Sequence, residues 1–133
     1  MSITQDKIKE VEKYLAELKG VLPEDINSYL ENLEKRLACE RAFEKITQAI
    51  NDLAILVIKE KRFKMPDENT KAFDILYNKK IISEELTNNL KKAMGMRNFL
   101  AHQYGDVDNE IVFKAIKEDI FEDVNKFLRE VQK

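Results

Sequence analysis

The sequence predicts an all-α fold, a four- to five-helix up-and-down bundle with one long spine helix. Helix breakers are rare, since the 133 residues include only three Gly and two Pro. Helix-favouring Lys, Glu and Leu are abundant. Apolar residues recur at steps of three and four, as on the buried face of a helix. The length suits one helical domain spanning residues 1–133.

The spine is predicted to begin near residues 23–25 and to end at about Arg62. A first helix precedes it, capped by Thr4 and closed by Gly20 and Pro23. At ~1.5 Å per residue the spine would reach roughly 50 Å, so other helices or a second subunit must cover it. Its predicted buried stripe is Ile26, Leu30, Leu33, Leu37, Phe43, Ile46, Ile50, Leu53 and Val57.

Three further helices are predicted after the spine. Asn69 opens a short one, Ser83 caps the next, and Asp108 caps the last, after a turn at residues 105–108. The helix after Ser83 is expected to bury Leu86, Leu90, Met94 and Phe99. The last helix is expected to bury Ile111, Val112, Ile116, Ile120, Phe121, Val124 and Leu128.

Composition restricts the function without identifying it. The net charge of −2 and pI of about 5.6 give no global sign of nucleic-acid binding, so any such role must depend on a local patch. The single cysteine, Cys39, excludes an internal disulfide and is read as a packed thiol rather than a nucleophile. With no signal peptide and no membrane-length apolar run, we expect a cytoplasmic protein with no membrane association.

The segment of residues 97–104 carries the most chemical information. Arg97 supplies a fixed cation, His102, the only histidine, titrates near neutral pH, and Tyr104 adds a phenol. These groups suit the handling of a phosphodiester. In a continuous helix Arg97 and His102 lie about 140° apart. A site containing all three residues therefore needs a helix end or bend near His102, or a contribution from a symmetry mate.

A structural interpretation of the same segment stays open. His102 could complement a helix dipole, Arg97 could be a surface cation, and Tyr104 could pack in the core with a wet hydroxyl. One histidine argues against a metal centre or a Ser-His-Asp triad. We therefore expect no metal and no cofactor.

The pattern Arg97-Asn98-xxx-His102-x-Tyr104, late in a helical chain of this length, resembles the HEPN superfamily and, more narrowly, the HepT-like toxins. Their motif is Arg, four residues, His, any residue, Tyr. Residues 37–44 and 48–52 of the spine also look like the equivalent helix of that family. The resemblance extends over nearly the whole chain.

The resemblance implies a metal-independent endoribonuclease toxin of a toxin–antitoxin module, working as a homodimer on RNA. Arg97 and His102 would be catalytic at the dimer interface and would leave a 2′,3′-cyclic phosphate. His102 would be the base for the 2′-OH, and Arg97 would clamp the phosphate oxygens. Asn98 would position substrate, although it could equally be solvated.

The resemblance also implies a partner, an antitoxin nucleotidyltransferase of the MNT type that adenylylates Tyr104. Alternatively Tyr104 orients His102 or stacks on a base. The alternative function is a non-catalytic helical nucleotide- or substrate-binding partner of a nucleotidyltransferase, and a third is a structural protein with no site. Glu40 and Asp52 could support Arg97 or be solvated. The same choice between a role with RNA and plain solvation applies to Lys59, Lys61, Arg62, Lys64, Lys79, Lys80, Lys91 and Lys92.

Overall fold

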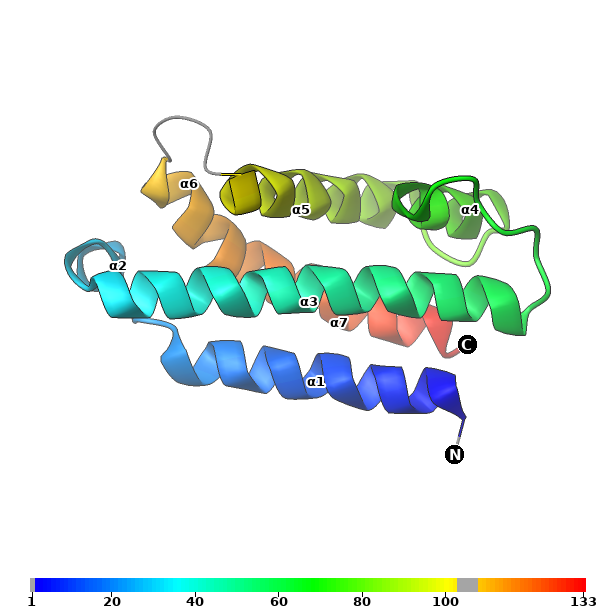
Figure 1. The fold of residues 1–133 in the computed structure, drawn as a ribbon, viewed down its shortest axis with the longest axis horizontal. Helices are drawn as coiled ribbons and strands as arrows, with labels where there is room; N and C mark the ends of the chain where they lie inside the picture. The colour runs from blue at the N-terminus through cyan, green and yellow to red at the C-terminus, as the bar shows by residue number, and fades with distance from the viewer. Residues whose placement is uncertain (1, 103–107) are drawn as a thin grey trace.

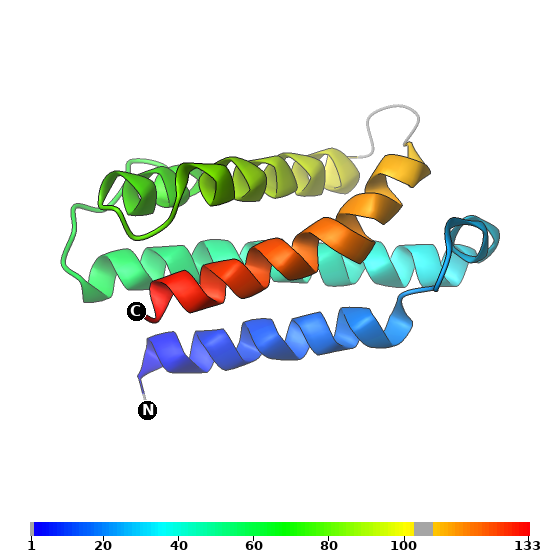
Figure 2. The same cartoon turned by 180° about the vertical axis from the view of Figure 1, so that it is seen from behind.

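The computed structural model describes the backbone of residues 2–102 and 108–133, and the side chains of residues 2–100 and 108–133. Its regular elements within those residues are all helical, which confirms the predicted all-α class. Four long segments run alternately up and down (Figures 1 and 2). They are α1 (Ile3–Val21), α3 (Leu33–Glu60), α5 (Glu84–His102), and the C-terminal segment of α6 (Asn109–Lys114), η2 (Ala115–Asp119) and α7 (Ile120–Val131).

The long spine helix is α3, and it begins later than the sequence predicted. The chain first forms a separate short helix, α2 (Ile26–Glu31). Asp25 caps the N-terminus of this helix, because its side chain accepts a hydrogen bond from the Ser28 amide at 2.8 Å. Asn32 then leaves the helical conformation, and its side chain accepts from the Lys35 amide at 3.0 Å. The predicted continuous helix from residues 23–25 is therefore wrong, because Asn32 acts as an N-cap inside the apolar stripe.

Two of the three predicted N-caps are confirmed. Ser83 Oγ accepts from the Leu86 amide at 3.1 Å, and Asp108 Oδ1 accepts from the Glu110 and Ile111 amides. The first cap is wrong, because Ser2 Oγ, not Thr4, accepts from an α1 amide, that of Gln5, at 3.0 Å. Asn69 opens a short 3-10 turn, η1 (Asn69–Lys71), which leads directly into α4 (Ala72–Asn78).

The hydrophobic core lies between α1, α3, α5 and the C-terminal segment. Phe73 of α4 and Phe127 of α7 meet edge to face with ring centroids 5.6 Å apart, and Tyr29 of α2 contacts Phe113 of α6 at 5.0 Å. Cys39 is fully buried, and burial raises the pKa of its thiol to about 11. A packed, inert thiol was the predicted state.

Several residues of the predicted buried stripes are exposed instead. They are Leu30, Leu33, Leu37, Phe99 and Ile111. The first three follow from the break at Asn32, which removes the cover that one continuous helix would have had.

The C-terminal segment is widened by one turn of π-helix, η2, in which the Ile120 amide bonds to the Ala115 carbonyl. The prediction of one regular helix for this segment is therefore wrong at residues 115–119. The wider turn rotates the residues before it relative to those after it. No helix in the described part of the chain is both long and apolar enough to cross a membrane.

Candidate functional site

Helix α5 carries Arg97 and is firmly anchored in the bundle. Its N-terminus is capped by Ser83, and Leu86, Leu90, Met94 and Leu100 fill the core beneath it. The helix continues to His102, so no bend separates Arg97 from that residue. The two Cα positions are therefore about 140° apart around the axis. The His102 side chain and the whole of Tyr104 lie outside the described residues.

The Arg97 guanidinium extends across to α3. Its Nη1 donates to Gln48 Oε1 at 3.3 Å, while its buried Nε has no hydrogen-bond partner among the described residues. Gln48 Nε2 donates in turn to Asp52 Oδ1 at 3.0 Å, and Lys7 Nζ of α1 lies 3.9 Å from Asp52 Oδ2. A polar chain thus connects α5, α3 and α1. It gives Arg97 one lateral contact and leaves further donors for a ligand.

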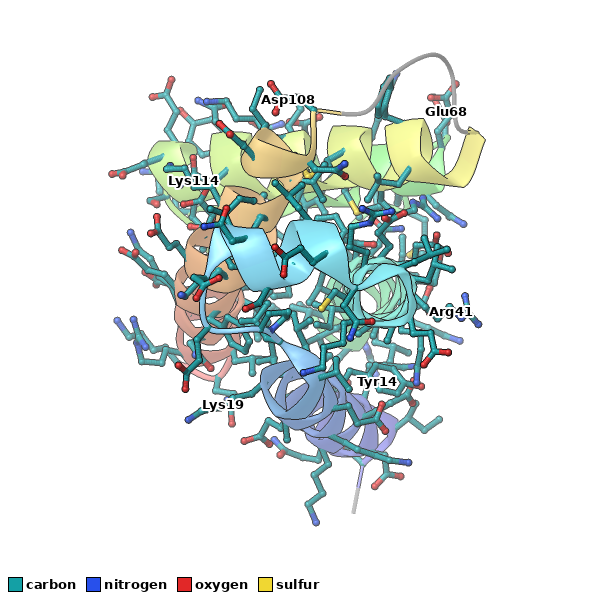
Figure 3. The ribbon with its side chains drawn as sticks, turned by 90° about the vertical axis from the view of Figure 1, so that its left-hand side faces the viewer. Tyr14, Lys19, Arg41, Glu68, Asp108 and Lys114 are labelled. Atoms are coloured by element: carbon teal, nitrogen blue, oxygen red, sulfur yellow. The ribbon has the colours of Figure 1, made fainter. Side chains whose placement is uncertain are left out.

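Beside Arg97 lies a hollow of about 230 Å³ between α1, α3 and α5. Figure 3 shows two of its residues, Tyr14 and Arg41, on the same side of the bundle, with Lys114 on the opposite side. We call it the Tyr14 hollow. It is lined by Glu10, Tyr14, Arg41, Glu44, Lys45, Gln48, Ala49, Asp52 and Arg97.

Charged groups alternate around the Tyr14 ring. Tyr14 Oη donates to Glu10 Oε1 at 3.0 Å; this bond is the main cause that lowers the pKa of Glu10 and raises that of Tyr14. Lys45 Nζ lies 4.5 Å from the ring centroid and 3.0 Å from Glu17 Oε2. The hollow therefore offers an aromatic surface beside the Glu10 carboxylate, whose pKa lies below its ordinary value.

The predicted supporting residues separate into two groups. Asp52 belongs to the Arg97 chain, although it reaches Arg97 through Gln48 and not directly. Glu40 lies on α3 more than two turns before Gln48, in a half-buried position where desolvation raises the pKa of its carboxyl. Asn98 is exposed and leaves α5 about 100° further round than Arg97.

The α3 face that carries Gln48 becomes apolar toward its N-terminus. Leu33 and Leu37 precede Arg41 at steps of four and are 57% and 51% exposed. Phe99 is also exposed, but it leaves α5 about 200° round the axis from Arg97. We call Leu33 and Leu37 the apolar rim. Adjacent exposed leucines on a helix face are typical of a surface that another chain covers.

Comparison with known proteins identifies the family of the chain. A family model described as ribonuclease HepT-like matches residues 11–131. The chain belongs to that family. It is similar to the tRNA nuclease HepT of Aphanizomenon flos-aquae, with 31% identity over 86% of this chain and 78% of that one. A putative RNase of Archaeoglobus fulgidus is 27% identical over 80% of this chain and 82% of its own length.

Solved structures show that the fold is shared as well. The Shewanella oneidensis HEPN toxin, tri-AMPylated and in complex with an MNT antitoxin, has a TM-score of 0.89 at 20% identity, covering 99% of this chain and 98% of that one. The cytosolic protein YutE of Bacillus subtilis, whose function is unknown, has a TM-score of 0.70 at 22% identity, covering 93% and 87%. The predicted resemblance to HepT-like proteins is thereby confirmed.

Membership in the HepT-like family leaves the role of each residue to be derived from this chain. The motif in the sequence indicates Arg97, but no sequence signal indicates Gln48, which lies 49 positions away in the chain. The Tyr14 hollow has no sequence signal either, since its residues come from three helices. In residues 2–100 and 108–133, no three His, Cys, Asp or Glu side chains converge as a metal site would require.

Proposed function

We propose that this protein is a metal-independent endoribonuclease that serves as the toxin of a toxin–antitoxin module. One observation supports this most: among the described residues, Arg97 is held at the edge of a polar hollow by its hydrogen bond to Gln48, which uses one of its five N–H donors. The family match and the relatives named as nucleases support the same reading.

The reaction needs only groups that this chain and its substrate supply. His102 takes the proton of the RNA 2′-OH, whose oxygen attacks the adjacent phosphorus. The bond from phosphorus to the 5′-oxygen breaks, and His102 of the partner subunit protonates that oxygen. The products are a 2′,3′-cyclic phosphate and a free 5′-OH. Arg97 binds the non-bridging oxygens through its planar fork, and exposed Asn98 positions the RNA.

A homodimer completes this site. The Cα positions of Arg97 and His102 are about 140° apart around one continuous helix, so we expect that one chain does not easily bring both residues to one phosphate. The apolar rim gives a second copy an exposed apolar surface to cover, on the same face of α3 as Gln48 but several turns closer to the start of that helix. Two-fold symmetry then brings Arg97 of one subunit toward His102 of the partner subunit.

The proposed partner is a nucleotidyltransferase antitoxin of the MNT type that adenylylates Tyr104. The similar Shewanella structure is named as an AMPylated toxin in complex with an MNT antitoxin. An AMP group on Tyr104 would add bulk and negative charge close in sequence to His102 and Arg97. It would oppose an RNA backbone by like-charge repulsion. Mass spectrometry of Tyr104 after co-expression with the antitoxin tests this step.

The decisive experiment compares wild type with Arg97→Ala and His102→Ala, scoring growth arrest on induction and cleavage of RNA by purified protein in EDTA. We expect both variants to lose arrest and cleavage. Arg129→Ala, at an exposed arginine of α7, is the matched control and should behave as wild type. Full cleavage by His102→Ala would overturn the mechanism. RNA binding without cleavage by wild type would favour the non-catalytic alternative.

A further inference from the structure

We propose that the Tyr14 hollow is a base-binding subsite, which holds one unpaired base of the RNA next to the phosphate bound by Arg97 and prefers guanine. This inference rests on the proposed function and adds a substrate preference to it. The hollow measures about 230 Å³, includes Arg97 in its wall and is open at the surface. A base placed there is therefore a direct neighbour of the cleaved bond.

The charges inside the hollow favour a base over a phosphate. The carboxylates of Glu10, Glu44 and Asp52 offset the cations of Arg41, Lys45 and Arg97 in its wall. A phosphate placed among three carboxylates would be repelled. A neutral base carries no such penalty, and its N–H groups are donors for those carboxylates.

Tyr14 provides the stacking surface. The Lys45 ammonium now lies over its ring at 4.5 Å and pairs with Glu17 at 3.0 Å. This ion pair is partly exposed and of low energy, so a base can displace Lys45 from the ring. Lys45 then remains close enough to contact the RNA backbone. Stacking on an aromatic ring is the usual way in which proteins hold splayed RNA bases.

Glu44 is the carboxylate best placed to select the base. Its Oε2 lies 3.4 Å from Arg41 Nη1, an ion pair on a largely exposed arginine, and Oε1 has no hydrogen bond within the described residues. Guanine presents two parallel donors, N1–H and N2–H, which one carboxylate can accept together. Uracil presents one N–H between two carbonyl oxygens, which a carboxylate repels. Freed from Glu44, Arg41 can contact a neighbouring phosphate.

The test uses short unstructured RNAs that differ at one position beside the cleaved bond, which carries guanine, inosine or uracil. Wild type should cleave the guanine RNA with a kcat/KM roughly tenfold above that for uracil. Inosine, which lacks the N2 amino group, should be intermediate. Glu44→Gln should remove most of the preference for guanine. Tyr14→Leu should lower kcat/KM for every base, because it removes the stacking surface. Tyr14→Phe keeps the ring and should retain the wild-type kcat/KM.

The matched control is Glu12→Gln, at an exposed position of α1 outside the hollow, which should preserve the preference. Equal cleavage of the three RNAs, or an unchanged preference in Glu44→Gln, would overturn the subsite and leave the ribonuclease function intact. Binding of the same RNAs to His102→Ala, followed by fluorescence anisotropy, separates the two proposals. If wild type cleaves nothing but His102→Ala still prefers guanine, the subsite stands and the proposed function fails. If neither protein distinguishes the bases, the subsite is rejected.

Discussion

Arg97 and Gln48 meet across the α5–α3 boundary, with Arg97 Nη1 donating to Gln48 Oε1 at 3.3 Å. Gln48 is itself held by Asp52, to which its amide donates at 3.0 Å. The glutamine therefore cannot rotate freely, and the guanidinium is held on the side of α5 that faces the Tyr14 hollow. We regard Gln48 as a positioning residue for Arg97.

Gln48→Ala should lower kcat for RNA cleavage by roughly three- to tenfold while changing KM little, because it removes a bond that orients Arg97 but leaves the arginine in place. Gln48→Glu should not restore full activity, because a carboxylate can accept from Arg97 but has no N–H to donate to Asp52 and would be repelled by it. Gln5→Ala, an exposed glutamine on α1, controls for the substitution itself. Single-turnover cleavage would measure the effect. An unchanged kcat in Gln48→Ala would show that Arg97 needs no lateral support.

If the protein forms the proposed homodimer, Leu33→Glu combined with Leu37→Glu should convert it to a monomer, because two charges per chain would have to be buried at the interface. Sedimentation at micromolar protein would show the change, and RNA cleavage should fall with the dimer fraction. Urea unfolding of the variant should become independent of protein concentration, because both side chains are more than half exposed in the single chain and only the stabilisation by dimerisation is lost. Ile3→Glu provides a control at a residue 71% exposed on α1. A dimer that survives the double change would place the interface elsewhere.

Glu40→Gln should increase the free energy of unfolding at pH 7 relative to wild type. Burial raises the pKa of the folded Glu40 carboxyl above its ordinary value of about 4.5, so the folded state binds the proton more tightly than the unfolded state. Wild-type stability from this group is thus fully present below pH 4.5 and is lost as the pH rises through the folded pKa. The advantage of the glutamine should shrink toward pH 4, as measured by urea unfolding at both pH values. If Glu40→Gln increased the free energy of unfolding equally at pH 4 and pH 7, burial of the ionised Glu40 carboxyl would be excluded as the cause.

Lys80→Gly should stabilise the protein by roughly 0.5–1 kcal/mol. Lys80 has a φ of 63°, in the left-handed region that suits glycine. It follows α4 in a Schellman turn, in which the Ile81 amide bonds to the Leu76 carbonyl at 2.9 Å. The neighbouring Lys79→Gly is the matched control, since its φ of −88° gains nothing from glycine. Thermal unfolding of the two variants should give Tm shifts of opposite sign.

The features that the sequence predicted well depend on local physics. The caps at Ser83 and Asp108 each involve an amide two or three residues away, and the burial of Leu86, Leu90 and Met94 follows from helical spacing. Arg97 was found through its motif. The family resemblance needed only the order of residues along the chain.

The features that the sequence did not predict depend on how residues far apart in the chain pack against one another. Asn32 could sit in a helix or cap one, and only the position of α2 decides between these. Ile111 continues a regular stripe, yet the π-turn that follows alters which residues face the core. From the sequence alone, Gln48 cannot be distinguished from the solvated residues of α3. Its role becomes visible only when the packing of α5 places Arg97 beside it. The Tyr14 hollow requires the same knowledge of how three helices pack.

The π-turn at Ala115–Asp119 also fixes the length of the C-terminal segment. Before it, Phe113 meets Tyr29 of α2; after it, Phe127 meets Phe73 of α4. Deleting one residue from the turn would restore a regular α-helix and rotate one half against the other by about 100°. Such a chain could keep one aromatic pair in place but not both. Natural relatives with a shortened segment would have to rebuild one end of the bundle.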